Sequence, residues 1–173
     1  MTRLLQWLGI AFLLALLWPE FQRYAAEYRL AQAAARLDRA LSRVDQGQAA
    51  LDSVIEAQRL THAAGLALPG DARPVMLEGV ALILSGQSQQ AIAVLEAGIA
   101  LGERPEFTIN LGRARAAIGD EAGARAAFLR SGWASPTALG TLPKPVRDSL
   151  LLEIQQLETE LRAGRLQAPP PLH

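Results

Sequence analysis

Residues 105–136 read PEFTINLGRARAAIGDEAGARAAFLRSGWASP, and residues 72–104 before them read ARPVMLEGVALILSGQSQQAIAVLEAGIALGER. Set 33 residues apart, the two stretches match without a gap at Gly79 and Gly112, Gly86 and Gly119, Ala91 and Ala124, Ala93 and Ala126, and Leu95 and Phe128. A short internal period with small residues at fixed places is typical of stacked helical hairpins. The sequence therefore predicts two consecutive helical hairpins that turn at Gly86 and Gly119.

The second stretch resembles a tetratricopeptide repeat. The residues that carry the resemblance are Leu111 and Gly112 in the first helix, Gly119 at the turn, Ala124 and Phe128 in the second helix, and the closing Pro136. The first stretch keeps Gly79, Ala91 and Leu95 but has Glu78 and Glu103 where leucine and proline are expected. The resemblance covers about 65 residues, the length of two repeats. It implies a helical solenoid that binds other proteins.

The repeated small residues have a packing reason. Two helices approach closely only where the side chains at their contact are small. We expect Gly112 and Ala124 to lie at such a crossing, with Phe128 filling the space beside it, and Asp120 to cap the second helix. Replacing Ala124 by leucine should then overpack the crossing by about 1–3 kcal/mol.

Composition narrows the class of protein. Half of the 173 residues are hydrophobic and few are aromatic, which suits an all-α domain. Lys and Arg together equal Asp and Glu at 17 each, so nucleic-acid binding has little support. The chain has no cysteine, which excludes disulfides and thiolate metal sites.

The amino terminus predicts a transmembrane helix over residues 1–19, which would contact the lipid bilayer through residues 4–18, LLQWLGIAFLLALLW. Arg3 before this run favours a cytoplasmic amino terminus, with the bulk of the chain in the periplasm of a bacterial inner membrane. A cleaved signal peptide and a buried core helix are the alternatives.

The remaining chain divides by its helical periodicity. Residues 20–71 form a stalk or hairpin, in which Phe21, Tyr24 and Tyr28 recur at helical spacing. Residues 72–136 hold the two repeats, and residues 137–164 a linker and a final helix with an apolar stripe. That helix is read as a solenoid cap or, alternatively, a coiled-coil seam. Residues 165–173 are expected to be a disordered tail.

Catalytic chemistry is not indicated, and we expect neither enzymatic activity nor a cofactor. A metal site needs more ligands at matched spacing than His62 and His173 supply. The serines and carboxylates fit caps and solvated helix faces.

A binding groove is indicated by the resemblance, because the first helix of each tetratricopeptide hairpin lines the concave face. By position, the groove residues are Arg73, Met76, Val80, Ile83, Glu106, Ile109, Asn110 and Arg113. Apolar members favour an amphipathic helix from a partner protein. The alternative is that the chain's own stalk or hairpin fills the groove.

Two functions follow from these patterns. The leading hypothesis is a membrane-anchored adaptor or assembly subunit that docks protein partners in a bacterial cell-envelope complex. The alternative is a structural accessory subunit whose transmembrane helix packs on a larger membrane protein.

Overall fold

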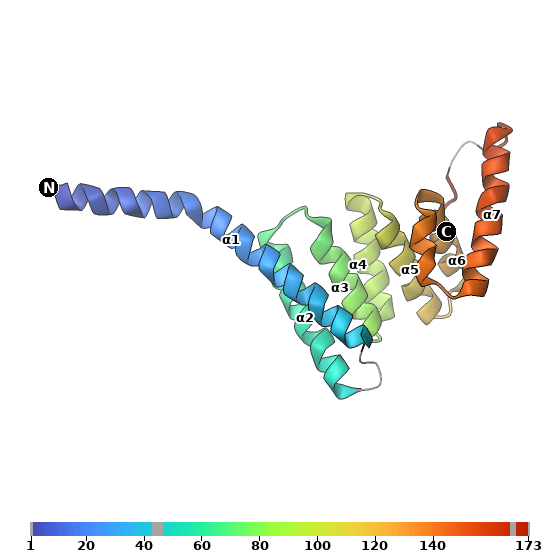
Figure 1. Cartoon of the computed structure of the whole chain (residues 1–173), viewed down its shortest axis with the longest axis horizontal. Coiled ribbons are helices and arrows are strands. Elements are labelled where there is room, and N and C mark those ends of the chain that lie inside the picture. The colour runs from blue at the N-terminus through green and yellow to red at the C-terminus, as the bar shows by residue number, and fades with distance from the viewer. Residues whose placement is uncertain (1, 43–46, 167–168, 173) are drawn as a thin grey trace. The chain divides into compact units, whose positions relative to one another are not determined.

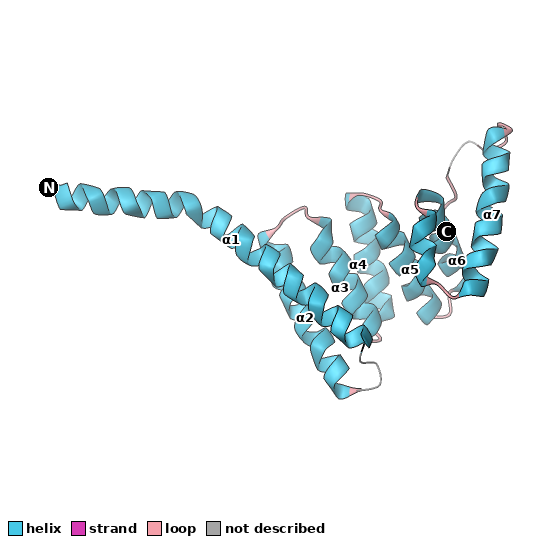
Figure 2. Cartoon of the chain, viewed as in Figure 1, coloured by secondary structure: helices cyan, strands magenta, loops and turns pink. Residues whose placement is uncertain are grey.

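The computed structural model describes residues 2–42, 47–166 and 169–172, and these residues contain helices and connecting loops but no strand (Figure 2). In chain order the helices are α1 (Thr2–Ser42), α2 (Gln48–Ala67), α3 (Ala72–Leu84), α4 (Ser88–Leu101), α5 (Pro105–Ala117), α6 (Glu121–Ala134), the 3-10 helix η2 (Pro136–Thr141) and α7 (Lys144–Arg162) (Figure 1). The all-α prediction is confirmed. The chain divides into two compact units, residues 1–74 and residues 75–173.

The first unit is a helical pair formed by α1 and α2. Helix α1 buries Ala26, Leu30, Ala33, Leu37 and Ala40, and α2 buries Val54, Ala57, Leu60, Thr61 and Ala64. Steps of three and four residues place each set on one face of its helix, and the alanines let the two backbones approach. Phe21, Tyr24 and Tyr28, which recur at helical spacing, are all exposed on α1.

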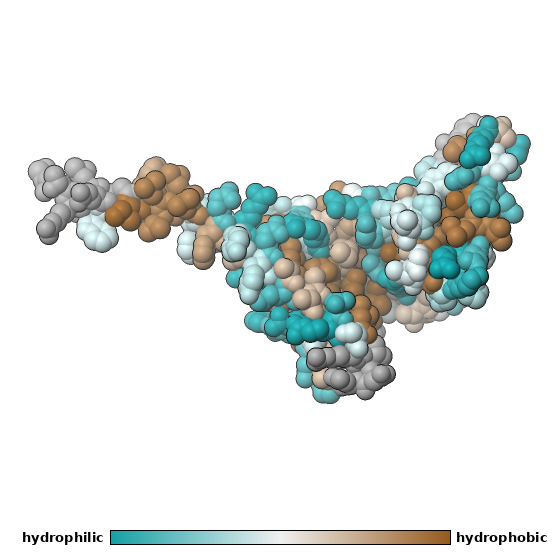
Figure 3. Space-filling view, in the orientation of Figure 1, coloured by the Kyte–Doolittle hydropathy of each residue, from teal (hydrophilic) through white to brown (hydrophobic). Residues whose placement is uncertain are grey.

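The amino-terminal part of α1 exposes large apolar side chains, seen as brown surface in Figure 3. Helix α1 runs through Pro19 and changes direction along its length (Figure 1). A proline inside a helix removes one backbone hydrogen bond and clashes with the preceding turn, which accounts for a bend.

The predicted membrane anchor at residues 1–19 is wrong, and so are the bilayer contact and the single-pass inner-membrane location. Among the residues that the structure describes, no helix combines the length and the apolar character needed to cross a bilayer. The physical reason is the shortness of the apolar run. Residues 4–18 extend about 22 Å as a helix, against a hydrocarbon core of about 30 Å. Pro19 and Glu20 follow at once.

The second unit stacks the remaining helices, beginning with the later part of α3. A Cβ atom placed on Gly79 of α3 would lie 2.5 Å from Leu95 Cδ2 of α4, and one on Gly112 of α5 would lie 2.4 Å from the ring of Phe128 on α6. In the α3–α4 pair and in the α5–α6 pair, the two helices therefore approach closely where a glycine faces a large side chain. The two pairs join where Gly98 of α4 faces Phe107 of α5, at 2.3 Å from an added Cβ atom.

The turns inside these pairs match the sequence prediction. Gly86 and Gly119 have positive φ angles of 76° and 82°, a conformation that glycine adopts without steric cost. The predicted N-cap is confirmed, since the Asp120 carboxylate accepts a hydrogen bond of 2.9 Å from the backbone N–H of Gly123.

The core of the second unit is completed by η2 and α7. Leu139 and Leu142 from the η2 region and Leu150 and Ile154 from α7 form one buried cluster with α5 and α6 residues. Of the apolar stripe on α7, Leu150 and Ile154 are buried, whereas Val146 and Leu161 remain exposed. This helix therefore packs against the hairpin through the middle of its stripe.

Candidate docking site on helix α5

Helix α5 carries the candidate site. Its sequence explains why the helix begins at Pro105 and how its start is attached to α6. Pro105 occupies the first turn, where its missing N–H costs no hydrogen bond and its fixed φ favours the helix. Glu106 in the same turn complements the positive end of the helix dipole. The Ser131 hydroxyl of α6 donates a hydrogen bond of 2.9 Å to the Pro105 carbonyl, which ties the start of α5 to α6.

A pocket of about 280 Å³ opens beside α5. Its lining comes from α3, α5 and the region of η2, and consists of Met76, Pro105, Glu106, Ile109, Asn110, Arg113, Ser135, Thr137, Ala138 and Thr141. Five of the eight groove residues predicted from the sequence are therefore brought together here. Their role in binding stays a prediction.

Arg113 is the most constrained charge in this pocket. Its Nη1 donates a hydrogen bond of 2.8 Å to Asn110 Oδ1, and its Nη2 donates one of 2.5 Å to Thr141 Oγ1. Asn110 is itself fixed, since its amide Nδ2 donates to the Glu106 carbonyl at 2.8 Å. Burial lowers the pKa of Arg113 from its ordinary value. Within the described part of the chain this cation forms no salt bridge, whereas Arg115, Arg125 and Arg130 each pair with a glutamate.

The pocket combines an apolar floor with one charge of each sign. Ile109 is 6 % exposed and belongs to the buried cluster, while Met76 is half-buried. Glu106 and Arg113 stand two helical turns apart on α5. A side chain entering the pocket would meet aliphatic carbon and, at the rim, a carboxylate or a desolvated guanidinium.

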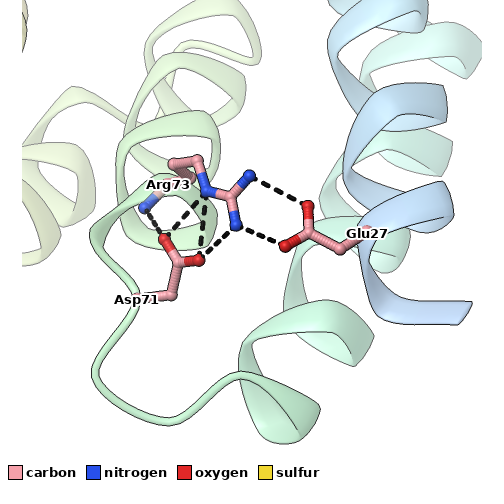
Figure 4. A network of polar contacts seen from close by, with 3 residues as sticks. All are labelled: Glu27, Asp71 and Arg73. Atoms are coloured by element: carbon pink, nitrogen blue, oxygen red, sulfur yellow. Dashed lines mark hydrogen bonds and ion pairs between the residues drawn. The ribbon is translucent and has the colours of Figure 1, made fainter. Parts of the chain in front are cut away.

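Arg73, a predicted groove residue, is bound within the first unit instead. Its guanidinium donates to both Glu27 carboxylate oxygens of α1, at 2.9 and 2.6 Å, and also to Asp71 (Figure 4). The hydrogen bonds from Arg73 lower the pKa of Glu27 and raise the pKa of Arg73. Asp71 also accepts from the Arg73 backbone N–H at 2.8 Å, so this network fixes the start of α3.

Val80 and Ile83 complete the predicted groove set. They follow Met76 on α3 at helical spacing and are half-buried, but they do not line the pocket. The pocket is therefore narrower than the groove expected from the sequence.

The predicted packing residues occupy the interhelical contacts. Leu111, Ala91, Leu95 and Ala124 are at most 2 % exposed, and Pro136 begins η2. An added Cβ atom on Gly112 would also lie 3.1 Å from the Ala124 carbonyl oxygen, so these two residues meet as expected.

Sequence reasoning missed the contribution of η2. Ser135, Thr137, Ala138 and Thr141 form one side of the pocket and provide a hydrogen-bond partner for Arg113. A signal was present, because Leu139 and Leu142 place apolar residues in the segment that is predicted to be a linker.

A metal centre is not indicated within residues 2–42, 47–166 and 169–172, where no group of three or more potential ligands gathers. His62 is exposed on α2, and His173 lies outside the described residues. No protein-family model, curated protein or solved structure matches the chain.

Proposed function

We propose that this chain is a non-enzymatic docking protein that binds protein partners through the α5 pocket. In this proposal the α3–α4 and α5–α6 pairs are tetratricopeptide-like hairpins, and α7 caps them. The equivalent glycine contacts at Gly79 and Gly112 support that kinship, because the same position of each pair faces a large side chain of the next helix.

The observation that carries the proposal is that Arg113 is partly buried and has no carboxylate partner within the described residues. A guanidinium that has lost part of its hydration gains most from an anionic partner when no internal carboxylate neutralises it. Asn110 and Thr141 hold its orientation before any partner arrives, which reduces the ordering cost of binding.

The size of the pocket indicates the kind of partner. Its volume of about 280 Å³ is small for a whole ligand, since such pockets measure from about 300 Å³ upward. It suits one or two side chains of a longer segment. We propose an amphipathic helix that places an aliphatic side chain over Ile109 and Met76 and a carboxylate against Arg113.

The test is quantitative affinity purification of the tagged full-length protein from the cells that naturally make it. Arg113→Met should lose co-purifying proteins that the wild type retains. Arg125→Met serves as the matched control, because Arg125 is exposed on α6 and pairs with Glu153 outside the pocket. Identical sets of proteins on both variants would refute docking through this pocket.

A further inference from the structure

A second surface of the same unit binds the carboxyl-terminal tail. The sequence predicts disorder for residues 165–173, yet Pro170 is buried and Leu172 half-buried, while Pro169 and Pro171 on either side of Pro170 are exposed. The Pro170 carbonyl accepts a hydrogen bond of 3.0 Å from Arg130 Nη1, and the Leu172 carbonyl accepts one of 2.5 Å from Arg115 Nη1. The tail is thus held through its backbone at two points.

Each of the two arginines is oriented by an acidic residue. Arg130 on α6 donates from Nε and Nη2 to the two Glu103 carboxylate oxygens, at 2.5 and 2.6 Å. Arg115 on α5 donates from Nη2 to Glu96 at 3.0 Å and from Nη1 to the Gly123 carbonyl at 3.3 Å. Because the guanidinium is a planar fork, fixing one edge aims the remaining N–H groups.

Arg115 is held in one orientation on this surface by burial and by several hydrogen bonds. It is 9 % exposed although it carries a charge, and burial of that kind requires partners. Those partners come from three places in the fold, namely Glu96 on α4, Gly123 on α6 and the tail.

The contacts suit an extended proline-rich chain. A polyproline II segment has no internal hydrogen bonds, so its carbonyls remain free to accept, and carbonyls two residues apart lie about 6 Å apart along it. Proline itself offers no N–H donor. Such a segment can therefore accept hydrogen bonds from Arg115 and Arg130, and it can place one proline where Pro170 is buried.

Apart from the buried Pro170, the tail is recognised through its backbone and not through its side chains. Both hydrogen bonds to the tail are accepted by main-chain carbonyls, those of Pro170 and Leu172. A segment of another protein with proline at the equivalent position would present the same acceptors.

We infer that Arg115 and Arg130 form a receptor for an extended proline-rich segment of a partner protein, and that residues 169–172 occupy it in competition with that partner. The receptor is separate from the α5 pocket. Arg113 and Arg115 are two residues apart and so point about 200° apart around the helix. The inference therefore stands or falls independently of the proposed function.

The test is fluorescence anisotropy with a labelled synthetic peptide that contains Pro-Pro-Pro-Leu between glycine and serine flanks. The full-length variant P169S/P170S/P171S removes the competing prolines without shortening the chain. We expect this variant to bind the peptide at least about tenfold more tightly than the wild type, because the tethered tail competes at a high effective concentration. A peptide with serine in place of all three prolines should bind neither protein.

Site variants decide whether binding uses this surface. In the P169S/P170S/P171S background, Arg130→Gln should weaken peptide binding at least about fivefold, the effect of losing one charge-assisted hydrogen bond. Arg125→Gln, on the same helix but bonded to Glu153 and Ser149, should leave it unchanged. Arg130 is preferred to Arg115 because Arg115 is more deeply buried. No binding to the tail variant, equal binding to wild type, or binding insensitive to Arg130→Gln would each overturn the inference.

Discussion

The α3–α4 and α5–α6 pairs are closed in the same way but present different chemistry. Both bury a glycine against a large side chain, Leu95 in the first pair and Phe128 in the second. At the positions 33 residues before Arg113 and Arg115, the first pair has Val80 and Leu82. The shared glycine contact therefore builds each helical pair, whereas the two arginines of α5 have no counterpart in the first pair.

The largest expected effect comes from removing the side chain that fills the second crossing. Phe128→Ala should lower the free energy of unfolding by about 3 kcal/mol, because it deletes a ring from the buried cluster and leaves a cavity. Leu95→Ala should cost about as much in the first pair, since Leu95 is fully buried. Urea denaturation of both variants measures the two values. A loss below about 1 kcal/mol for either would show that its crossing is not a core contact.

The two glycines should differ in how much they tolerate a methyl group. Gly112→Ala should cost about 2 kcal/mol, because the added atom meets a rigid ring and the Ala124 carbonyl. Gly79→Ala should stay within about 1 kcal/mol, since the Leu95 side chain can turn away and alanine favours the helix.

Phe128→Leu provides the control for this difference. It gives the second pair the side chain type of the first, so Gly112→Ala in that background should cost no more than Gly79→Ala does. A double-mutant cycle measured by urea denaturation gives the coupling. If the effects of Gly112→Ala and Phe128→Leu on stability were additive, contact between these two residues would not be the cause of the cost of Gly112→Ala.

Replacing each arginine of α5 by the residue at the equivalent position of the first pair should affect stability differently for Arg113 and Arg115. Arg115→Leu, the residue at position 82, should destabilise by about 1–2 kcal/mol, because the Gly123 and Leu172 carbonyls lose a buried donor. Arg113→Val, the residue at position 80, should change stability by less than about 1 kcal/mol, because it removes a desolvated cation along with its hydrogen bonds. Thermal denaturation compares them. The reverse order would mean that Arg113 serves folding and not binding.

The smallest expected effect is a pH dependence at Glu103. Its hydrogen bonds with Arg130 lower the pKa of Glu103 below its ordinary value of 4.5. Because the folded pKa is the lower one, the pair contributes stability above about pH 4.5 and loses it as the pH falls through the folded pKa. The contribution should be under about 1 kcal/mol, since both side chains are partly exposed.

Urea denaturation of wild type and Glu103→Gln at pH 7 and pH 3 measures this effect. The stability difference between the two proteins should shrink at pH 3. A constant difference would show that the charge of Glu103 makes no contribution.

The sequence predicted the helices of the second unit well because strong local signals coincide there. Turn glycines, the Asp120 cap and the small residues at both crossings agree on the same boundaries. In the first unit, helical spacing indicated a helical stalk or hairpin, but it did not show which face of α1 is buried. Phe21, Tyr24 and Tyr28 recur at helical spacing but are exposed, and the buried face of α1 is the alanine-rich one.

The candidate site was predicted only in part, because it needs contacts that local pattern does not encode. The resemblance to a tetratricopeptide repeat predicted that Ile109, Asn110 and Arg113 line one groove, and all three line the pocket. It could not show that Arg73 bonds to Glu27, which is 46 residues away in the chain, or that Arg113 bonds to Thr141, 28 residues away. Those pairings follow from the tertiary arrangement.

Photo-crosslinking from the rim of the pocket tests the central claim most directly. A benzoylphenylalanine at Thr137, which is exposed and lines the pocket, should give a discrete crosslinked product in the cells that naturally make the protein. The same group at Glu121, exposed at the start of α6, is the control and should not give that product. Docking through α5 predicts that Arg113→Met abolishes the Thr137 product. A product that persists in that variant, or that forms equally from Glu121, would contradict the account.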